Sequence, residues 1–300
     1  MGTWDIGLYS SDIAIDLKLS IKVICSLPYD DKRIVDEIVE SYKDIAFDKD
    51  DEDCTVFWLV LADQLHKKGF NCPEVFEKAI RIIDSGQDVK IFRDLGADES
   101  SLKKREGKLQ KLKDKLIESP PNKVRKILKK PEKLLFDIGD VILFPLDERG
   151  LPFNPYYTAK QIAEEPDIFI QTGWGAAVIV DNGLIYDYLT YYKLIVCNKS
   201  FEFDDKPRLN TLMNTSTWVI ENPGTCSKSH FKKMQIEKIG TIDINKKRAK
   251  KIFANHKYAL SAAVDNISIS NYLNTGVSLK YTNVINSLYD LPIKRLRILR

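Results

Sequence analysis

Five carboxylates lie within six consecutive positions of the first part of the chain. They are Asp48, Asp50, Asp51, Glu52 and Asp53. A calcium loop of the EF-hand type needs a glycine at its sixth position and a bidentate glutamate at its twelfth. Counted from Asp48, this run has Asp53 and Leu59 at those positions, so its pattern does not predict a calcium site. Two interpretations remain: a solvated loop that caps the following helix, or a surface that recognises a cationic partner.

A second set of candidate contact residues is aromatic and lies in the other half of the chain. It comprises Trp174, Tyr188 and Tyr191. Tryptophan and tyrosine are enriched at the energetic centres of protein interfaces, and the same residues also pack well within sheets. Both interpretations stay open, and we take these three as candidate partner-binding residues beside the acidic run.

Catalytic and metal-binding patterns are weak in this sequence. Its three histidines are His66, His230 and His256. The pair Cys226 and His230 supplies two zinc ligands where a structural zinc normally needs four. The chain has no Gly-x-Ser-x-Gly, phosphate-binding loop or dinucleotide fingerprint. We therefore predict no catalytic residue, metal site or cofactor, while an enzyme activity is unsupported rather than excluded.

The charge is distributed unevenly along the chain. Residues 1–118 hold 19 Lys+Arg against 25 Asp+Glu, and residues 119–300 hold 27 against 18, within an overall net charge of +3. Six cations fall in one short segment, Lys123, Arg125, Lys126, Lys129, Lys130 and Lys133, and further ones in an expected helix at 245–257. Basic clusters neutralise phosphates, so nucleic-acid binding is the main alternative function.

The elements that position these groups differ between the two halves. Helical spacing of apolar residues predicts a helix that Asp30 or Asp31 caps, with apolar positions from Ile34 to Ile45. Further helices are predicted at 55–68, at 73–85 with Gly86 ending it, and at 101–118. For residues 13–23 strict alternation favours a strand, whereas a cap at Ser11 or Asp12 favours a helix, which we prefer. Residues 1–118 are therefore predicted to form an all-helical domain, followed by a basic linker at 119–133 that begins with two prolines.

The remaining residues, 134–300, have the short apolar runs of a β-rich domain. Strands are predicted at 141–144, 191–197 and 217–221. Asp181-Asn182-Gly183 is expected to form a hairpin turn between strands 176–180 and 184–188, because Asn-Gly readily adopts a type I′ turn. The whole chain is thus predicted to have an α+β fold.

The composition of the chain predicts the cellular compartment in which it is found. The chain is 44% hydrophobic and 30% charged, as in globular proteins, and no apolar run approaches the roughly 20 residues of a membrane span. We expect neither a membrane association nor a secretion signal. Five scattered cysteines are more typical of a reducing cytosol than of a disulfide framework, so a cytoplasmic location is predicted.

Two stretches resemble known bacterial families. The opening, with Gly2, Trp4, Gly7, Asp12, Ala14 and Asp16 in place, resembles a little-characterised family that begins Met-Gly-x-Trp-Gly-x-Gly-x-Phe-x-x-Asp-x-Ala-x-Asp. Asp5 departs from the usual glycine, and Tyr9 replaces phenylalanine. The segment Val56–Asp63, which contains Trp58, is similar to the same family. This resemblance implies a helical domain but no activity, and Gly2, Trp4, Gly7 and Trp58 are expected to anchor that domain.

The second resemblance is shorter and carries the functional expectation. Residues Ile138–Leu146 resemble the start of a β-rich immunity domain of bacterial polymorphic-toxin systems. It implies a protein that binds a toxin stoichiometrically and neutralises it. The sequence thus favours a cytoplasmic, protein-binding immunity or antitoxin protein over a nucleic-acid-associated one.

Overall fold

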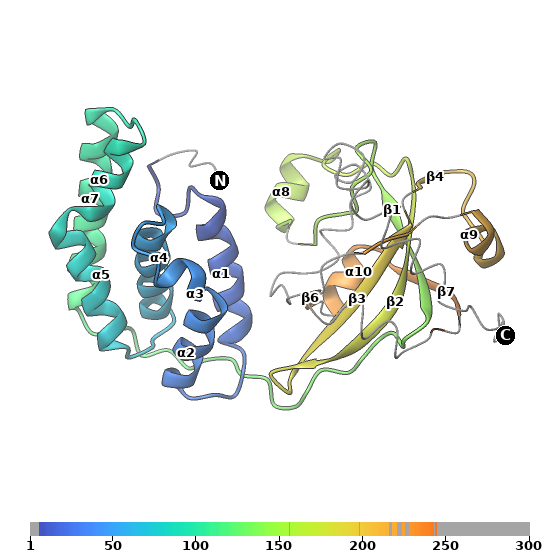
Figure 1. Cartoon of the computed structure of the whole chain (residues 1–300), viewed down its shortest axis with the longest axis horizontal. Coiled ribbons are helices and arrows are strands. Elements are labelled where there is room, and N and C mark those ends of the chain that lie inside the picture. Colours follow the sequence, from blue (N-terminus) through green and yellow to red (C-terminus); the bar gives the residue numbers. More distant parts are fainter. Residues whose placement is uncertain are drawn as a thin grey trace. The chain divides into compact units, whose positions relative to one another are not determined.

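The computed structural model describes residues 6–155, 157–197, 199–215, 218–220, 224–225, 228–242 and 244. The chain divides into two compact units, Met1–Lys129 and Lys130–Arg300. The described part of the first unit is helical, and that of the second contains an antiparallel sheet with short helices (Figure 1). The predicted α+β class is confirmed. The helix expected at 245–257 lies outside the described residues.

The helices of the first unit begin and end at residues suited to those positions. Ser11 and Asp30 cap two of them by accepting hydrogen bonds from backbone amides, Pro73 occupies the first turn of another, and Gly86 ends that helix at φ 66°. These are the favoured starts and stops of helices. The helices are α1 (Asp12–Ile24), α2 (Asp31–Ser41), α3 (Lys43–Ala46), α4 (Asp53–Lys67), α5 (Pro73–Ser85), α6 (Gln87–Asp94) and α7 (Glu99–Ile117).

Helix α4 forms the centre of the first unit, as its almost continuous apolar sequence predicts. Phe57 and Trp58 are both buried, and their rings meet edge to face with centroids 5.1 Å apart. The indole nitrogen of Trp58 donates to the Ala46 carbonyl over 2.9 Å, which ties α4 to α3. Residues 13–23 belong to α1, so the helical interpretation of that stretch is confirmed.

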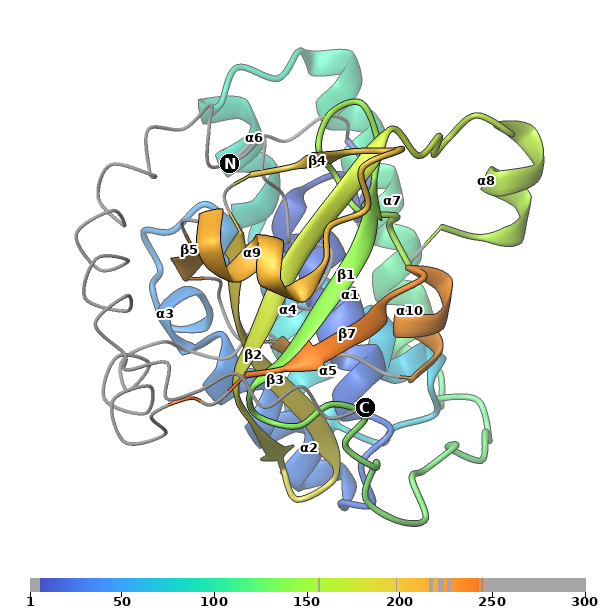
Figure 2. The ribbon, with the colours of Figure 1, turned by 90° about the vertical axis from the view of Figure 1, so that its right-hand side faces the viewer.

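The second unit is built on a sheet in which every described strand pair is antiparallel. The strand order is β5-β3-β2-β1-β7, with β4 paired to β2 and β6 paired to β3. Figure 2 shows the long strands β1 and β2 running side by side through its centre. The strands are β1 (Asp140–Leu146), β2 (Gly173–Ile185), β3 (Leu189–Cys197), β4 (Phe201–Glu202), β5 (Trp218–Ile220), β6 (Gly224–Thr225) and β7 (Glu237–Thr241).

Both faces of this sheet are covered by apolar side chains. Val141 and Leu143 of β1 point into one cluster that includes Leu212, whereas Ile142 and Phe144 point into another that includes Phe231. Because successive strand residues face opposite sides, a strand buried on both faces reads as the unbroken apolar run that β1 shows. The covering helices are α9 (Leu209–Thr215) and α10 (Lys228–Lys233), whereas α8 (Ala159–Glu164) has no buried residue.

The hairpin between β2 and β3 turns at a different place from the one predicted. Strand β2 continues through Asn182 and Gly183, and the turn is formed by Tyr186 and Asp187, which have φ angles of 54° and 60°. The Asn182 amide donates to the Phe136 carbonyl over 2.7 Å. A Cβ on Gly183 would lie 2.8 Å from the Tyr191 ring. Tertiary contacts therefore hold Asn182 and Gly183 in the strand, and the predicted turn at Asp181-Asn182-Gly183 is wrong.

The turn before β1 is fixed by Gly139 and Asp140. Gly139 has a φ of 96°, a conformation that favours glycine. The buried Asp140 carboxylate accepts hydrogen bonds from the Asp137 amide at 2.9 Å and the Thr241 hydroxyl at 2.9 Å. Lys238 adds an ion pair at 2.7 Å. These residues fasten β1 to β7.

Within the described ranges, no helix has the length and apolar character that crossing a membrane would require.

Candidate partner-binding site

The predicted acidic run forms a loop between α3 and α4, which we call the acidic loop (residues 47–53). Its shape comes from carboxylates that accept backbone hydrogen bonds two residues further along the chain. Asp48 accepts from the Asp50 amide at 3.0 Å, and Asp51 accepts from the Asp53 amide at 2.7 Å. Such local turns are typical of aspartate. They fix the backbone of the loop and let α4 begin at Asp53.

The negative charges of the acidic loop are not balanced locally. Among the ion pairs of the described residues, none includes a carboxylate from Asp48 to Asp53. Helical carboxylates nearby behave differently, since Asp36 pairs with Lys32 and Glu40 with Lys43, each at 2.7 Å. Asp48, Asp50 and Glu52 are exposed. The acidic loop therefore presents a concentrated and unpaired negative charge to solvent.

Mutual repulsion within the acidic loop is visible at Asp53. Burial raises the pKa of its carboxyl, and the charges of Asp51 and Glu52 raise it further. Like charges at short distance disfavour the ionised form. A positively charged group bound at the loop would relieve this repulsion.

An exposed aromatic residue stands at the start of the acidic loop and was not predicted as a contact residue. The Phe47 side chain is 64% exposed and has the Lys78 ammonium 5.8 Å from its ring centroid. An apolar centre with a charged rim is the usual anatomy of a protein interface. The sequence did contain a signal for Phe47. It is an aromatic residue that adjoins a run of charged residues and lies outside the apolar periodicity of the neighbouring helices.

The three aromatic candidates lie in or next to the sheet of the second unit, and each makes contacts within that unit. The Trp174 indole donates to the Phe203 carbonyl over 3.0 Å, and the Lys206 ammonium lies 4.4 Å from its ring centroid. The Tyr188 carbonyl accepts from the Glu132 amide at 2.8 Å. The Tyr191 ring covers Gly183. All three are partly buried. The side-chain contacts of Trp174 and Tyr191 account for these two as packing residues, whereas the contact of Tyr188 is made by its backbone.

The predicted basic linker is held to the first unit by two of its cations. The Lys123 ammonium donates to the Lys67 carbonyl over 2.8 Å, and the Arg125 guanidinium donates to the Tyr29 carbonyl. The guanidinium also lies 5.1 Å from the centre of the Phe70 ring. These two side chains thus have structural roles. The other four cations, Lys126, Lys129, Lys130 and Lys133, are exposed.

The anchors expected near the N-terminus are described only in part, because Gly2 and Trp4 lie outside the described residues. The Gly7 carbonyl accepts from the Arg105 guanidinium at 2.9 Å. The Tyr9 hydroxyl donates to the Asp63 carboxylate, which fastens the opening segment to α4. Trp58 is a core residue.

Neither a metal-ligand cluster nor a known relative gives further information about the function of the acidic loop. In the part of the chain that the structure describes, no three His, Cys, Asp or Glu side chains converge as metal ligands. Comparisons with protein-family models, curated proteins and solved structures gave no match. The functional argument therefore rests on the chain's own residues.

Proposed function

We propose that this chain is a bacterial protein-binding protein of the immunity or antitoxin kind, which neutralises a basic protein toxin by stoichiometric binding. The observation that carries the proposal is the unpaired negative charge of the acidic loop beside the exposed Phe47. The resemblance of residues Ile138–Leu146 to a bacterial immunity domain supports the toxin as the class of partner.

Each part of the acidic loop has a distinct task in this proposal. Asp48, Asp50 and Glu52 attract the basic partner during its approach, which raises the association rate more than the affinity. Phe47 then packs against an apolar patch of the partner and slows dissociation. A standard interface buries about 800 Å² on each protein, so residues around the loop also contribute. Coverage of the toxin's active cleft blocks access of its substrate.

The proposed location of this activity is the bacterial cytoplasm. Cys25, Cys54 and Cys72 are buried free thiols, as is common for proteins of reducing compartments. Burial raises the pKa of Cys25 to about 11 and that of Cys72 to about 12, so both remain protonated at neutral pH.

Co-expression with the proteins encoded beside this chain's gene tests the proposal. Wild-type chain is expected to restore growth to cells that produce one of these proteins as a toxin. The variant D48N/D50N/E52Q is expected to restore growth less well. The matched control D94N/E106Q/D114N removes the same charge from exposed helical positions of the first unit and is expected to protect fully. Failure of the wild-type chain against every neighbouring protein would overturn the proposal.

A nucleic-acid-associated function is the second candidate, and the four exposed lysines of the linker favour it. None of Lys126, Lys129, Lys130 and Lys133 takes part in an ion pair within the described ranges. Gel-shift titration at two salt concentrations separates the two functions, because phosphate contacts make affinity fall steeply with salt. This candidate requires tight, salt-sensitive binding that is lost in K126Q/K129Q/K130Q/K133Q and kept in the control K103Q/K104Q/K108Q/K111Q.

A further inference from the structure

One end of the helical unit is crossed by a basic segment, which we call the strap (residues 118–129). In Figure 1 it is the green stretch of chain that follows α7 along the lower end of the helices. The Lys123 ammonium donates to the Lys67 carbonyl over 2.8 Å. A Cβ on Gly69 would lie 2.5 Å from the Pro121 carbonyl oxygen, so the strap passes directly over the end of α4. The strap is therefore a fixed part of this unit.

The strap turns polar side chains toward the helices and apolar ones toward solvent. Lys123 and Arg125 both donate to carbonyls of the helical unit, whereas Val124 between them is 96% exposed. This alternation is that of an extended chain. Ile127 is 47% exposed on the same segment. The outer side of the strap thus offers apolar side chains whose burial by a partner would be favourable.

Positive charge surrounds these apolar residues. The strap contains four cations, Lys123, Arg125, Lys126 and Lys129, and its one carboxylate is Glu118. None of the four cations belongs to an ion pair in the part of the chain that the structure describes. The net charge of the strap is therefore +3. A partner that suits it has an exposed apolar group and an excess of carboxylates.

The acidic loop of this same chain has that chemistry. It carries the exposed Phe47 and five carboxylates against one lysine. The two surfaces lie at opposite ends of α4, because the loop leads into its first residue, Asp53, and the strap contacts its last, Lys67. A helix of 15 residues spans about 22 Å. The complementary surfaces of one chain are thus placed to meet those of another copy.

We propose that this chain binds a second copy of itself head to tail, with the acidic loop of one copy on the strap of the next. Phe47 packs on Val124 and Ile127, and the carboxylates of the loop face Lys126 and Lys129. A head-to-tail contact is open-ended unless it closes into a ring, so the assemblies grow with concentration. Two short segments bury less than the standard area of about 800 Å² on each partner, so the association is weak and reversible.

This inference uses the acidic loop of the function proposed above but requires no toxin. Failure of growth rescue would leave it standing, and a chain that stays monomeric would leave the proposed toxin binding standing. If both hold, a toxin and a second copy compete for the same loop.

Sedimentation velocity of the full-length chain at rising concentrations, in about 20 mM and about 500 mM salt, tests the inference. The wild type is expected to form dimers and longer species at low salt and to return to monomers at high salt. D48N/D50N/E52Q and K126Q/K129Q are each expected to raise the dissociation constant about fivefold or more, as for several exposed charge pairs.

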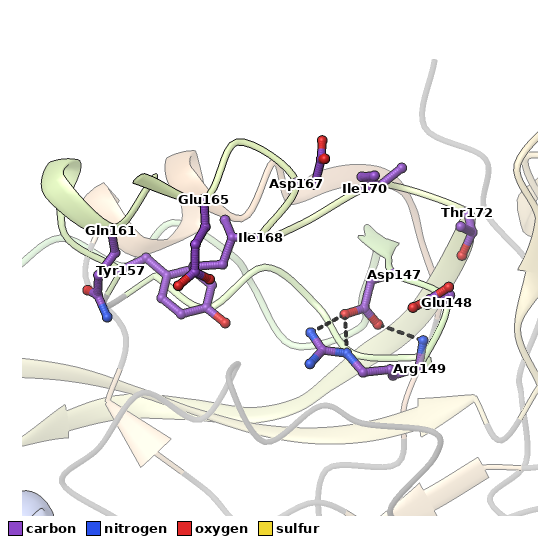
Figure 3. Close-up of a pocket in the computed structure, with 10 residues that line it drawn as sticks. All are labelled: Asp147, Glu148, Arg149, Tyr157, Gln161, Glu165, Asp167, Ile168, Ile170 and Thr172. Carbon is purple, nitrogen blue, oxygen red and sulfur yellow. Dashed lines mark hydrogen bonds and ion pairs between the residues drawn. The ribbon is translucent and has the colours of Figure 1, made fainter. Parts of the chain in front are cut away.

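Two matched controls remove the same charges elsewhere and are expected to associate as the wild type does. K108Q/K111Q removes two exposed lysines of α7. E148Q/E165Q/D167N removes three exposed carboxylates that surround a hollow beside α8 in the second unit (Figure 3).

A charge exchange between copies identifies the two surfaces as each other's partners. D48K/D50K/E52K and K126E/K129E are each expected to be monomeric alone, because in each the loop and the strap have charge of the same sign. Their mixture is expected to associate, since the altered loop of one variant meets the altered strap of the other. Restored association also shows that both variants are folded.

A mixture that stays monomeric, or a wild type that stays monomeric at low salt, would overturn the inference. A monomeric wild type that binds duplex DNA in gel-shift titrations through Lys126 and Lys129 would assign the strap to nucleic acid instead.

Discussion

Arg105 is a buried arginine whose guanidinium connects three parts of the first unit. It is 1% exposed, and its guanidinium donates to the Asp88 carboxylate at 2.8 and 3.0 Å as well as to the Gly7 carbonyl. Thr55 also donates to Asp88, at 3.2 Å. The arginine thereby joins α7, α6 and the opening segment through buried polar contacts.

Replacement of Arg105 by alanine is expected to lower the free energy of unfolding by about 3–5 kcal/mol, because it leaves the buried Asp88 charge uncompensated. Urea unfolding followed by circular dichroism measures this change. The matched control R93A removes an exposed arginine that pairs with Glu99 at 3.3 Å and is expected to cost no more than about 1 kcal/mol. Equal and small losses in both variants would contradict the role of Arg105.

Asp63 makes the stability of the first unit depend on pH. Burial alone would raise the pKa of its carboxyl, but hydrogen bonds from Lys115, Lys67 and Tyr9 outweigh burial and lower it below the usual value of 3.8. Because the pKa is lower in the folded state, the Asp63 carboxylate adds stability above its unfolded-state pKa. That contribution is lost as the pH falls through the folded-state pKa.

Acidification from about pH 5 to about pH 2 is therefore expected to destabilise the wild type more steeply than D63N. Urea unfolding at a series of pH values provides the comparison. Parallel curves for the two proteins would show that Asp63 is not responsible.

The burial of Arg105 was predictable from the sequence, but its pairing with Asp88 was not. Arg105 falls on the leucine stripe of α7, three residues after Leu102 and four before Leu109, and both leucines are buried. Its position on the apolar face was thus predictable. Its partner Asp88 was not, because contacts between separate helices leave no periodic trace in the sequence.

At the scale of elements, local signals were sufficient to place several of the helix ends. The termination at Gly86 follows from residue chemistry and was predicted, and Ser11 and Asp30 are each one of the two caps predicted for their helices. The position of the turn between β2 and β3 was not predicted correctly, because Tyr186 and Asp187 occupy positive φ angles without the usual glycine. Contacts of Asn182 and Gly183 with distant residues override their local preference for a turn.

Two glycine substitutions test the position of this hairpin turn. D187G is expected to be neutral or to stabilise the second unit by up to about 1 kcal/mol, since glycine adopts a positive φ without steric cost. D181G is expected to destabilise it by about 1–3 kcal/mol, because it weakens the strand and removes the ion pair with the largely buried Lys193 at 3.3 Å. Thermal unfolding distinguishes them. The opposite order would place the turn at Asp181-Asn182-Gly183.

At the scale of the molecule, the connection between the two units is short. The Leu128 amide donates to the Ser26 carbonyl in the first unit, and the Glu132 amide donates to the Tyr188 carbonyl in the second, each over 2.8 Å. No hydrogen bond of the described residues holds the backbone between them. Only Lys129, Lys130 and Pro131 therefore act as a connector, although the composition of residues 119–133 suggested a longer linker.

Limited proteolysis with trypsin is expected to cut early after Lys129, because unfastened backbone is the preferred site of cleavage. Mass spectrometry should detect a fragment that ends at Lys129, and the variant K129Q should delay its appearance. Early cleavage after Lys123 or Lys126 instead would show that the linker is not fastened to the first unit.

The central claim is that the acidic loop guides a basic partner protein onto this chain. The most direct measurement is the association rate with the toxin identified by growth rescue, followed by stopped-flow fluorescence at about 10 mM and about 150 mM salt. The wild type and D94N/E106Q/D114N are expected to associate about tenfold or more faster than D48N/D50N/E52Q at low salt, with a smaller difference at high salt. Equal association rates for all three proteins at low salt would contradict the claim.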